Sequence, residues 1–64
     1  MDVKKLSLDI LIYRNRNRLS LSAVERRHGI HKNTLSHIEQ GRTPLVPTLE
    51  KICAMLGTHP GDYF

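Results

Sequence analysis

Polar side chains whose hydrogen-bonding groups suit nucleic-acid bases are concentrated between positions 31 and 37. The group consists of His31, Lys32, Asn33, Thr34 and His37. In the major groove, an ammonium group can donate to guanine O6 and N7, and an amide can pair with adenine N6 and N7. An ordinary solvated surface helix carries residues of the same kind, so the elements that hold these side chains must distinguish the two interpretations.

The segment around these side chains has the pattern of two short helices joined by a tight turn. Its apolar residues fall at helical spacing, at Val24, Ile30, Leu35 and Ile38. Gly29 separates the two periodic stretches, and glycine adopts the left-handed conformation that ends a helix at little cost. The second helix is expected from about Lys32 to Gln40, with His31 at its N-cap and Gly41 at its end. A helix with one buried face and one polar face suits a DNA major groove.

A longer helix is expected before this segment, over residues 3–17. Its inward stripe repeats at every third or fourth residue and consists of Val3, Leu6, Ile10 and Tyr13. Ser20 is the expected N-cap of the next helix, because its hydroxyl can accept an amide hydrogen bond. Ser22 and Glu25 form a rival capping box that would start that helix two residues later.

Two further elements are expected after the turn that follows residue 41. Pro47 suits the first turn of a helix, with Val46 as a lead-in contact to the core. The inward stripe of this helix consists of Leu49, Ile52, Cys53 and Leu56. Pro60 then opens a last short turn, in which Tyr63 and Phe64 are expected to cover the end of the core.

Length and charge restrict the fold and the partner. With 64 residues and no strand pattern, residues 1–64 are expected to form one all-α, compact five-helix domain. The formal net charge is +4. Seven of the ten basic residues lie between positions 14 and 42, where Glu25 and Glu39 are the only acidic residues. The seven are Arg14, Arg16, Arg18, Arg26, Arg27, Lys32 and Arg42. This excess indicates either a polyanion partner or a solvated basic surface, and the helix-turn-helix spacing favours the polyanion.

Other features of the sequence argue against secretion and membrane insertion. Cys53 is the only cysteine, so no disulfide can form within the chain, which fits the reducing cytoplasm. No apolar run approaches the ~18 residues that span a membrane. The first residues lack the pattern of a signal peptide. We therefore expect a cytoplasmic protein without a membrane partner.

Metal binding and catalysis are not expected. The candidate metal ligands are His28, His31, His37, His59 and Cys53. Structural zinc sites need four closely organised ligands, and this chain has no cysteine pair to support one. The sequence also lacks paired carboxylates, a nucleophile with an adjacent base, and a phosphate-cradling loop. The protein is therefore expected to be no enzyme and to use neither a metal nor a cofactor.

The order of residues between 19 and 41 resembles that of a known family. The pattern is LS-x4-E-x3-GI-x3-TLS-x-IE-x-G, and the similarity continues through Pro44, Val46, Leu49, Lys51, Ile52, Leu56 and Gly57. It resembles the lambda-repressor-like, or Cro-repressor-type (XRE, Cro/C1-type), helix-turn-helix family and covers nearly the whole chain. The resemblance implies a dimeric regulator, mostly a repressor, that binds inverted-repeat operator DNA on the nucleoid of a bacterium, encoded by host, phage or plasmid.

The resemblance also implies which residues contact DNA. The base-reading positions are His31, Lys32, Asn33 and His37. The backbone contacts are Arg14, Ser20, Leu21, Thr34, Ser36, Gln40 and Arg42. Arg14 is expected to pair with Glu39 and so to tie the first helix to the third.

The chain departs from the family pattern in four places. Leu21 replaces a glutamine that often touches phosphate, and Pro47 replaces an acidic or polar residue. Glu25 replaces a small alanine, so either the two helices lie wider apart or Glu25 turns outward to a cation such as Lys32. His28 replaces an apolar residue and is expected at the edge of the core.

A protein partner is the main alternative to DNA. Leu8, Leu11 and Ile12 form a second apolar stripe on the first helix, where the family is usually polar. Met55, Tyr63 and Phe64 are further candidates for such a face. These residues are expected to support self-association or a regulatory protein partner, which would suit an antitoxin or an adaptor module.

Overall fold

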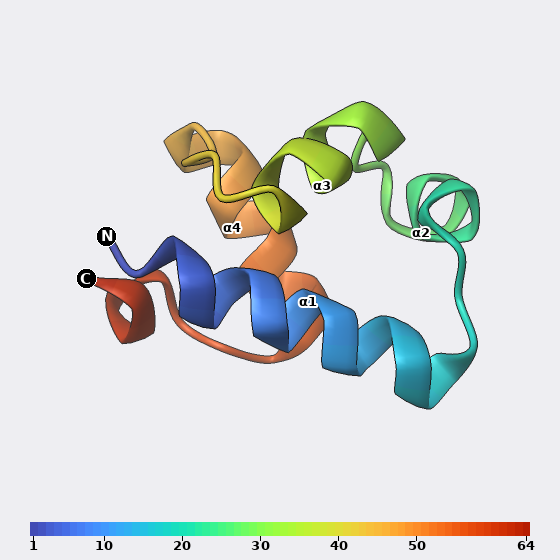
Figure 1. Ribbon diagram of the computed structural model, residues 1–64, viewed down its shortest axis with the longest axis horizontal. Coiled ribbons are helices and arrows are strands. Elements are labelled where there is room, and N and C mark those ends of the chain that lie inside the picture. Colours follow the sequence, from blue (N-terminus) through green and yellow to red (C-terminus); the bar gives the residue numbers. More distant parts are fainter.

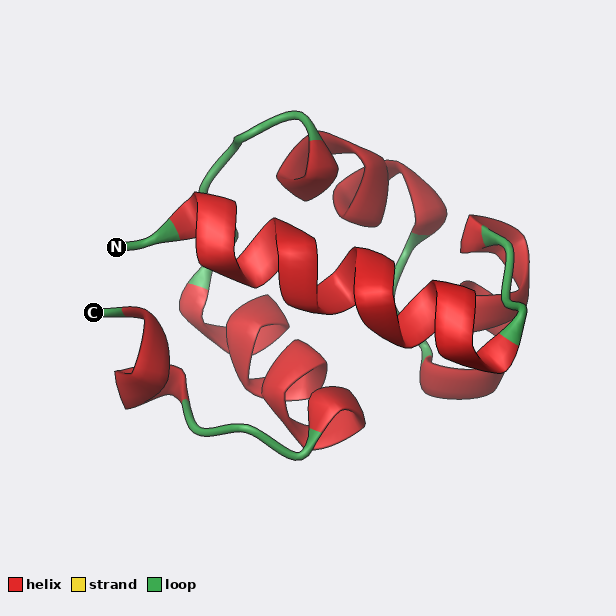
Figure 2. Cartoon of the chain, turned by 60° about the horizontal axis from the view of Figure 1, so that its bottom comes forward, coloured by secondary structure: helices red, strands yellow, loops and turns green.

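The computed structural model describes residues 1–64 and consists of four α-helices and one 3-10 helix. The elements are α1 (Val3–Asn17), α2 (Leu21–His28), α3 (Lys32–Glu39), α4 (Val46–Leu56) and η1 (Pro60–Tyr63). Figure 1 shows α1 along one side of the molecule and η1 beside the N-terminus. In Figure 2, where the whole chain is helix or loop, α1 lies in front of α3 and α4, and it contacts both.

The all-helical prediction is therefore confirmed, but the count of five helices is not matched in full. The last element spans only Pro60–Tyr63 and is a 3-10 helix. A segment this short favours the tighter i to i+3 hydrogen bonding of a 3-10 turn over a complete α-helix. None of the helices is both long enough and apolar enough to cross a membrane.

Local capping explains where α2 begins and ends. The Ser20 hydroxyl accepts a hydrogen bond from the Ala23 amide at 3.1 Å, as predicted. The rival start at Ser22 is wrong, because Ser22 lies inside the helix. Gly29 ends α2 with φ at +70°, in the left-handed conformation that a residue with a Cβ adopts only at a cost.

Every helix contributes to one apolar core. The buried residues are Leu6, Ile10, Val24, Ile30, Leu35, Ile38, Leu49, Ile52, Cys53 and Tyr63. Leu35 and Ile38 hold the inner side of α3 against this core, and α3 contacts both α1 and α2. A helix of eight residues is barely stable alone, so packing against the core is what holds α3 in place.

Two expectations about the core were wrong. Val46 is 62% exposed, because it is the first residue of α4 and the core contact is made one turn later, at Leu49. Phe64 is 78% exposed, so Tyr63 alone covers the end of the core. The hydroxyl of the buried Tyr63 keeps hydrogen-bond partners, because it donates to the Asp9 carboxylate at 2.8 Å and lies 3.2 Å from the Thr58 hydroxyl.

Candidate nucleic-acid interface

The turn between α2 and α3 places the start of α3 with a local hydrogen bond. His31 is the N-cap residue, and its Nδ1 atom accepts a hydrogen bond from the Asn33 amide at 3.1 Å. This bond satisfies one of the amides that a helix start leaves without an internal partner. A ring nitrogen that accepts this hydrogen bond thus has the role that serine or aspartate usually performs at an N-cap.

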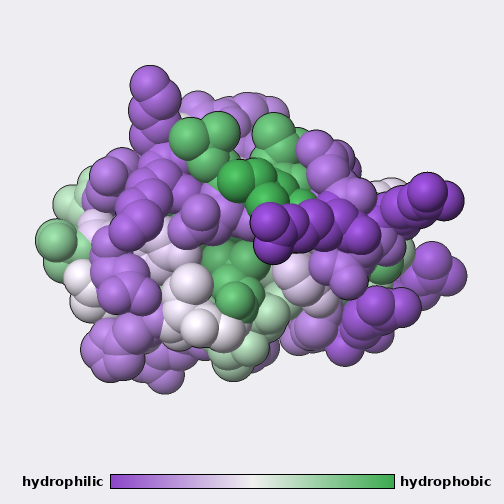
Figure 3. Space-filling model, turned by 90° about the horizontal axis from the view of Figure 1, so that it is seen from below, coloured by the Kyte–Doolittle hydropathy of each residue, from purple (hydrophilic) through white to green (hydrophobic).

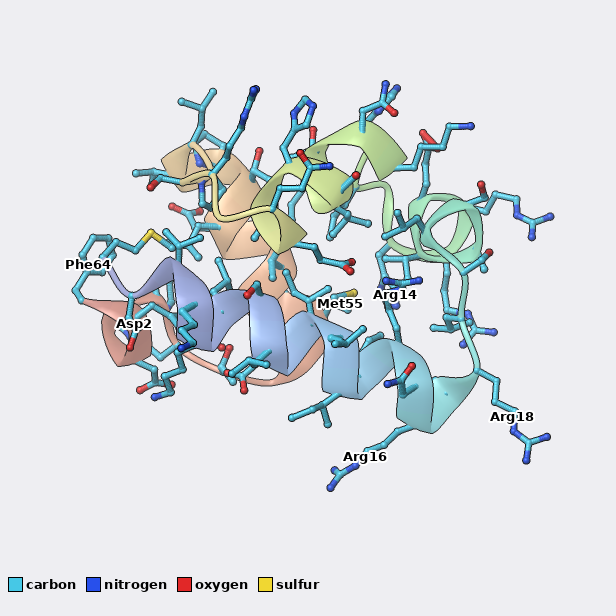
Figure 4. The ribbon with its side chains drawn as sticks, in the orientation of Figure 1. Asp2, Arg14, Arg16, Arg18, Met55 and Phe64 are labelled. Carbon is cyan, nitrogen blue, oxygen red and sulfur yellow. The ribbon has the colours of Figure 1, made fainter.

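The outer side of α3 is polar and exposed. Lys32, Asn33 and His37 are all exposed, and Asn33 and His37 lie opposite the buried Leu35 and Ile38. The side chains of Lys32, Asn33 and His37 form neither a hydrogen bond nor an ion pair within the protein. Those of His31 and Glu39 do. Figure 4 shows side chains that extend from the side of α3 facing away from α1. Their donors and acceptors are therefore available to a ligand.

The residues expected to contact the DNA backbone surround this outer side. Ser36 and Gln40 are linked, because the Gln40 side-chain amide donates to the Ser36 hydroxyl at 3.2 Å. Arg42 is exposed just beyond α3, and Thr34 is half-buried beside it. Leu21 packs partly against the core at the start of α2, so its side chain is an apolar contact within the protein.

Arg14 and Glu39 connect α1 to the end of α3. The Arg14 Nη1 atom lies 2.9 and 2.8 Å from the two carboxylate oxygens of Glu39, and the Arg14 Nε atom donates to the Leu19 carbonyl at 3.2 Å. Both side chains are largely shielded, with exposed fractions of 20% and 22%. In Figure 4, Arg14 points into the molecule while Arg16 and Arg18 extend outward. Arg14 is thus engaged inside the protein, and only its exposed remainder can reach a phosphate.

The Glu25 carboxylate faces the ring of His31 and not Lys32, the cation that the sequence suggested. The Glu25 carboxylate lies 3.9 Å from the Nε2 atom of His31, across the turn that joins α2 to α3. His31 therefore faces the backbone of α3 with one ring nitrogen and Glu25 with the other. Both contacts compete with the base-reading role that the sequence suggested for this residue.

His28 lies at the edge of the core, as predicted. Its Nε2 atom is 2.9 Å from the hydroxyl of Tyr13, and the two rings meet edge to face with centroids 5.9 Å apart. The pair joins α2 to α1. No three histidine, cysteine or acidic side chains come together as a group that could hold a metal ion.

Sequence reasoning missed a part of the surface that comes from α4. Two hollows lie between α3 and α4, and Thr34 and Thr48 line both of them. Basic side chains border these hollows, namely His31, His37, Arg42 and Lys51. Thr48 gave no signal in the sequence and Lys51 only matched the family pattern, because the apolar stripe of α4 indicated a scaffold helix. The exposed polar surface of α3 thus continues onto α4.

The comparison with known families agrees with this geometry. The model of the helix-turn-helix domain family matches residues 12–62, which is most of the chain. The protein therefore belongs to this family of helix-turn-helix DNA-binding domains, a class that is typically not enzymatic. None of the curated proteins or solved structures compared with the chain is a significant match.

Proposed function

We propose that this protein is a sequence-specific transcriptional regulator of the lambda-repressor-like (XRE) type, a dimeric repressor of the bacterial cytoplasm. Residues 1–64 act as its single DNA-binding domain. One observation carries the proposal: α3 exposes Lys32, Asn33 and His37 while Leu35 and Ile38 hold it from behind. A short helix fixed in this way can enter a major groove with its polar side toward the base edges.

Within this proposal, Lys32 and Asn33 choose the sequence. Lys32 donates to guanine, and Asn33 pairs with adenine through both atoms of its amide. His37 lies four residues beyond Asn33 and so shares its face of the helix, where it reaches a base or a phosphate. His31 contributes less to base contact than Lys32 and Asn33, since both of its ring nitrogens already face groups of the protein.

Contacts with the DNA backbone set the orientation of α3. Ser20 and Leu21 place the first amides of α2 toward a phosphate, which the helix start attracts without any side chain. The side chains that assist are Thr34, Ser36, Gln40 and Arg42, with the exposed part of Arg14. Basic groups supply much of the attraction, and their binding releases counterions from the DNA. Affinity should therefore fall steeply as the salt concentration rises, because added salt reduces the free-energy gain from that release.

The experiment that tests the proposal is selection of bound fragments from random-sequence DNA, followed by the mass of the purified complex. We expect an enriched inverted repeat whose half-sites lie ~10 bp apart or a multiple of that. The complex should contain two protein chains per duplex. If no sequence is enriched, the protein does not bind DNA sequence-specifically. A complex of one protein chain with a single half-site would contradict the proposed dimer.

A further inference from the structure

A second exposed face of the molecule lies on α1 and has the opposite chemistry. Leu8, Leu11 and Ile12 are 49%, 40% and 49% exposed. Their spacing of three and four residues places them together on one side of the helix, which we name the α1 face. Figure 3, which views the molecule from the side of α1, shows apolar atoms gathered in the middle and polar atoms around them. The family match begins only at Ile12, so it does not explain Leu8 and Leu11.

Positive charge lies at both ends of the α1 face. Lys4 is one turn before Leu8, Arg16 is one turn after Ile12, and both side chains are exposed. Neither is in an ion pair. The one acidic residue on α1 is Asp9, which is half-buried and accepts the hydrogen bond from Tyr63. The exposed surroundings of the apolar patch are therefore cationic along the helix.

We propose that the α1 face binds an amphipathic helix of another protein, with apolar residues in its middle and acidic residues at both ends. Apolar groups on a partner helix would cover Leu8, Leu11 and Ile12. Carboxylates one turn away on each side would meet Lys4 and Arg16. The charge pattern thus selects an acidic partner and opposes a basic one.

A second copy of this chain fits the α1 face poorly. Two α1 helices that cross in parallel bring Lys4 near Lys4 and Arg16 near Arg16. Two that cross antiparallel bring Lys4 near Arg16 at both ends. Each arrangement places like charges together, and the small area of three half-exposed side chains gives little apolar burial to offset the repulsion.

A membrane surface also fits less well than a protein helix. Helices that lie in the lipid interface present a long apolar side, whereas the apolar part of the α1 face is confined to residues 8–12. The α1 face points away from α3, because Leu6 and Ile10 on the other side of α1 are buried in the core that holds α3. The partner helix and DNA therefore occupy separate surfaces, and this inference does not depend on the proposed function.

The probe for this surface is a synthetic amphipathic helix of about 15 residues, with leucines on one side and glutamates at both ends of that side. Its control carries lysines in place of the glutamates. Titration by fluorescence anisotropy with the full chain should give at least about tenfold tighter binding of the glutamate peptide. Equal binding of the two peptides would overturn the proposal.

Three variants locate the binding. Leu8→Gln with Ile12→Gln should abolish binding of the glutamate peptide, and circular dichroism should show unchanged helix content, because both side chains are half-exposed. Lys4→Glu with Arg16→Glu should reverse the preference in favour of the lysine peptide. Arg26→Glu with Arg27→Glu makes the same change of net charge on α2 and should keep the original preference. Loss of preference in this last variant would mean attraction by net charge alone and would overturn the proposal.

The other occupants are tested with the same variants. Sedimentation equilibrium should show the same association state for the wild type and for Leu8→Gln with Ile12→Gln. Dissociation of an otherwise dimeric protein in this variant would assign the α1 face to a second copy and overturn the proposal. Binding to phosphatidylglycerol vesicles that the variant loses would assign it to a membrane, with the same consequence.

Discussion

The outer sides of α3 and α1 differ in chemistry although both helices pack against the same core. The outer side of α3 exposes Lys32, Asn33 and His37, whose polar groups have no partner within the protein. The α1 face exposes Leu8 and Ile12 with positive charge at its ends. The difference shows that core packing determines where a helix lies, whereas the residues outside the core determine what that helix can bind.

The two helices are also held in different ways. α3 has only eight residues, and Leu35, Ile38 and the Arg14–Glu39 pair fix it to the rest of the protein. α1 has fifteen residues and is joined to the C-terminal turn by the hydrogen bond between Tyr63 and Asp9. The outer side of α3 should therefore be the more sensitive of the two to changes in its support.

The largest expected effect comes from the core side of α3. Leu35 is fully buried, so Leu35→Ala should lower the free energy of unfolding by about 2–5 kcal/mol through lost burial and the cavity left behind. Leu8→Ala, on the exposed α1 face, should change it by less than about 0.5 kcal/mol. Urea denaturation followed by circular dichroism measures both. Similar losses in the two variants would mean that the α1 face is part of the core.

A smaller effect is expected at the support of α1. Tyr63→Phe removes the hydrogen bond to Asp9 and should cost about 1–2 kcal/mol of unfolding free energy. Burial raises the pKa of the Tyr63 hydroxyl from 10.0 to about 12, with Asp9 adding to the rise and the hydrogen bond with Thr58 opposing it.

This pKa predicts how the effect of Tyr63→Phe depends on pH. Since the folded state holds the Tyr63 proton more tightly than the unfolded state, the associated stability is fully present below pH 10 and is lost between pH 10 and about 12. The difference in unfolding free energy between the wild type and Tyr63→Phe should shrink over that interval. A difference that stays constant across it would contradict the raised pKa.

The smallest expected effect concerns the ion pair behind α3. Glu39→Gln keeps the size of the side chain but removes its charge, and the loss of unfolding free energy should be about 1 kcal/mol or less because solvent partly screens the pair. Denaturation at low and high salt measures it, and the loss should decrease at high salt. A loss that did not change with salt would indicate that shape rather than charge connects Arg14 to Glu39.

Much of the local structure could be predicted from the sequence because its signals are local. Helical periodicity predicted α1, and the serine and glycine at the two ends of α2 gave the limits of that helix. The same periodicity predicted that Leu35 and Ile38 anchor α3. The prediction of DNA contacts at Lys32 and Asn33 stays a prediction, although both side chains are exposed.

The errors fall where local signals are weak. Tyr63 was expected on a partner face as well as over the core, but it is 1% exposed, so it cannot belong to such a face, and Met55 is half-buried against the core. The bond between Tyr63 and Asp9 joins residues 54 positions apart, and tertiary packing alone brings them together. The partner of Glu25 was likewise missed, since the turn at Gly29 decides which side chain of α3 or its N-cap lies nearest.

The central claim is that the outer side of α3 reads the DNA sequence. Its most direct test is the affinity of Asn33→Ala and Arg42→Ala for a selected site and for a scrambled duplex at the same salt concentration. Asn33→Ala should lose about 1–3 kcal/mol of discrimination between the two duplexes and keep most of its affinity for the scrambled one. Arg42→Ala should weaken binding to both duplexes alike. If both variants weaken both duplexes by the same factor, α3 does not read the sequence.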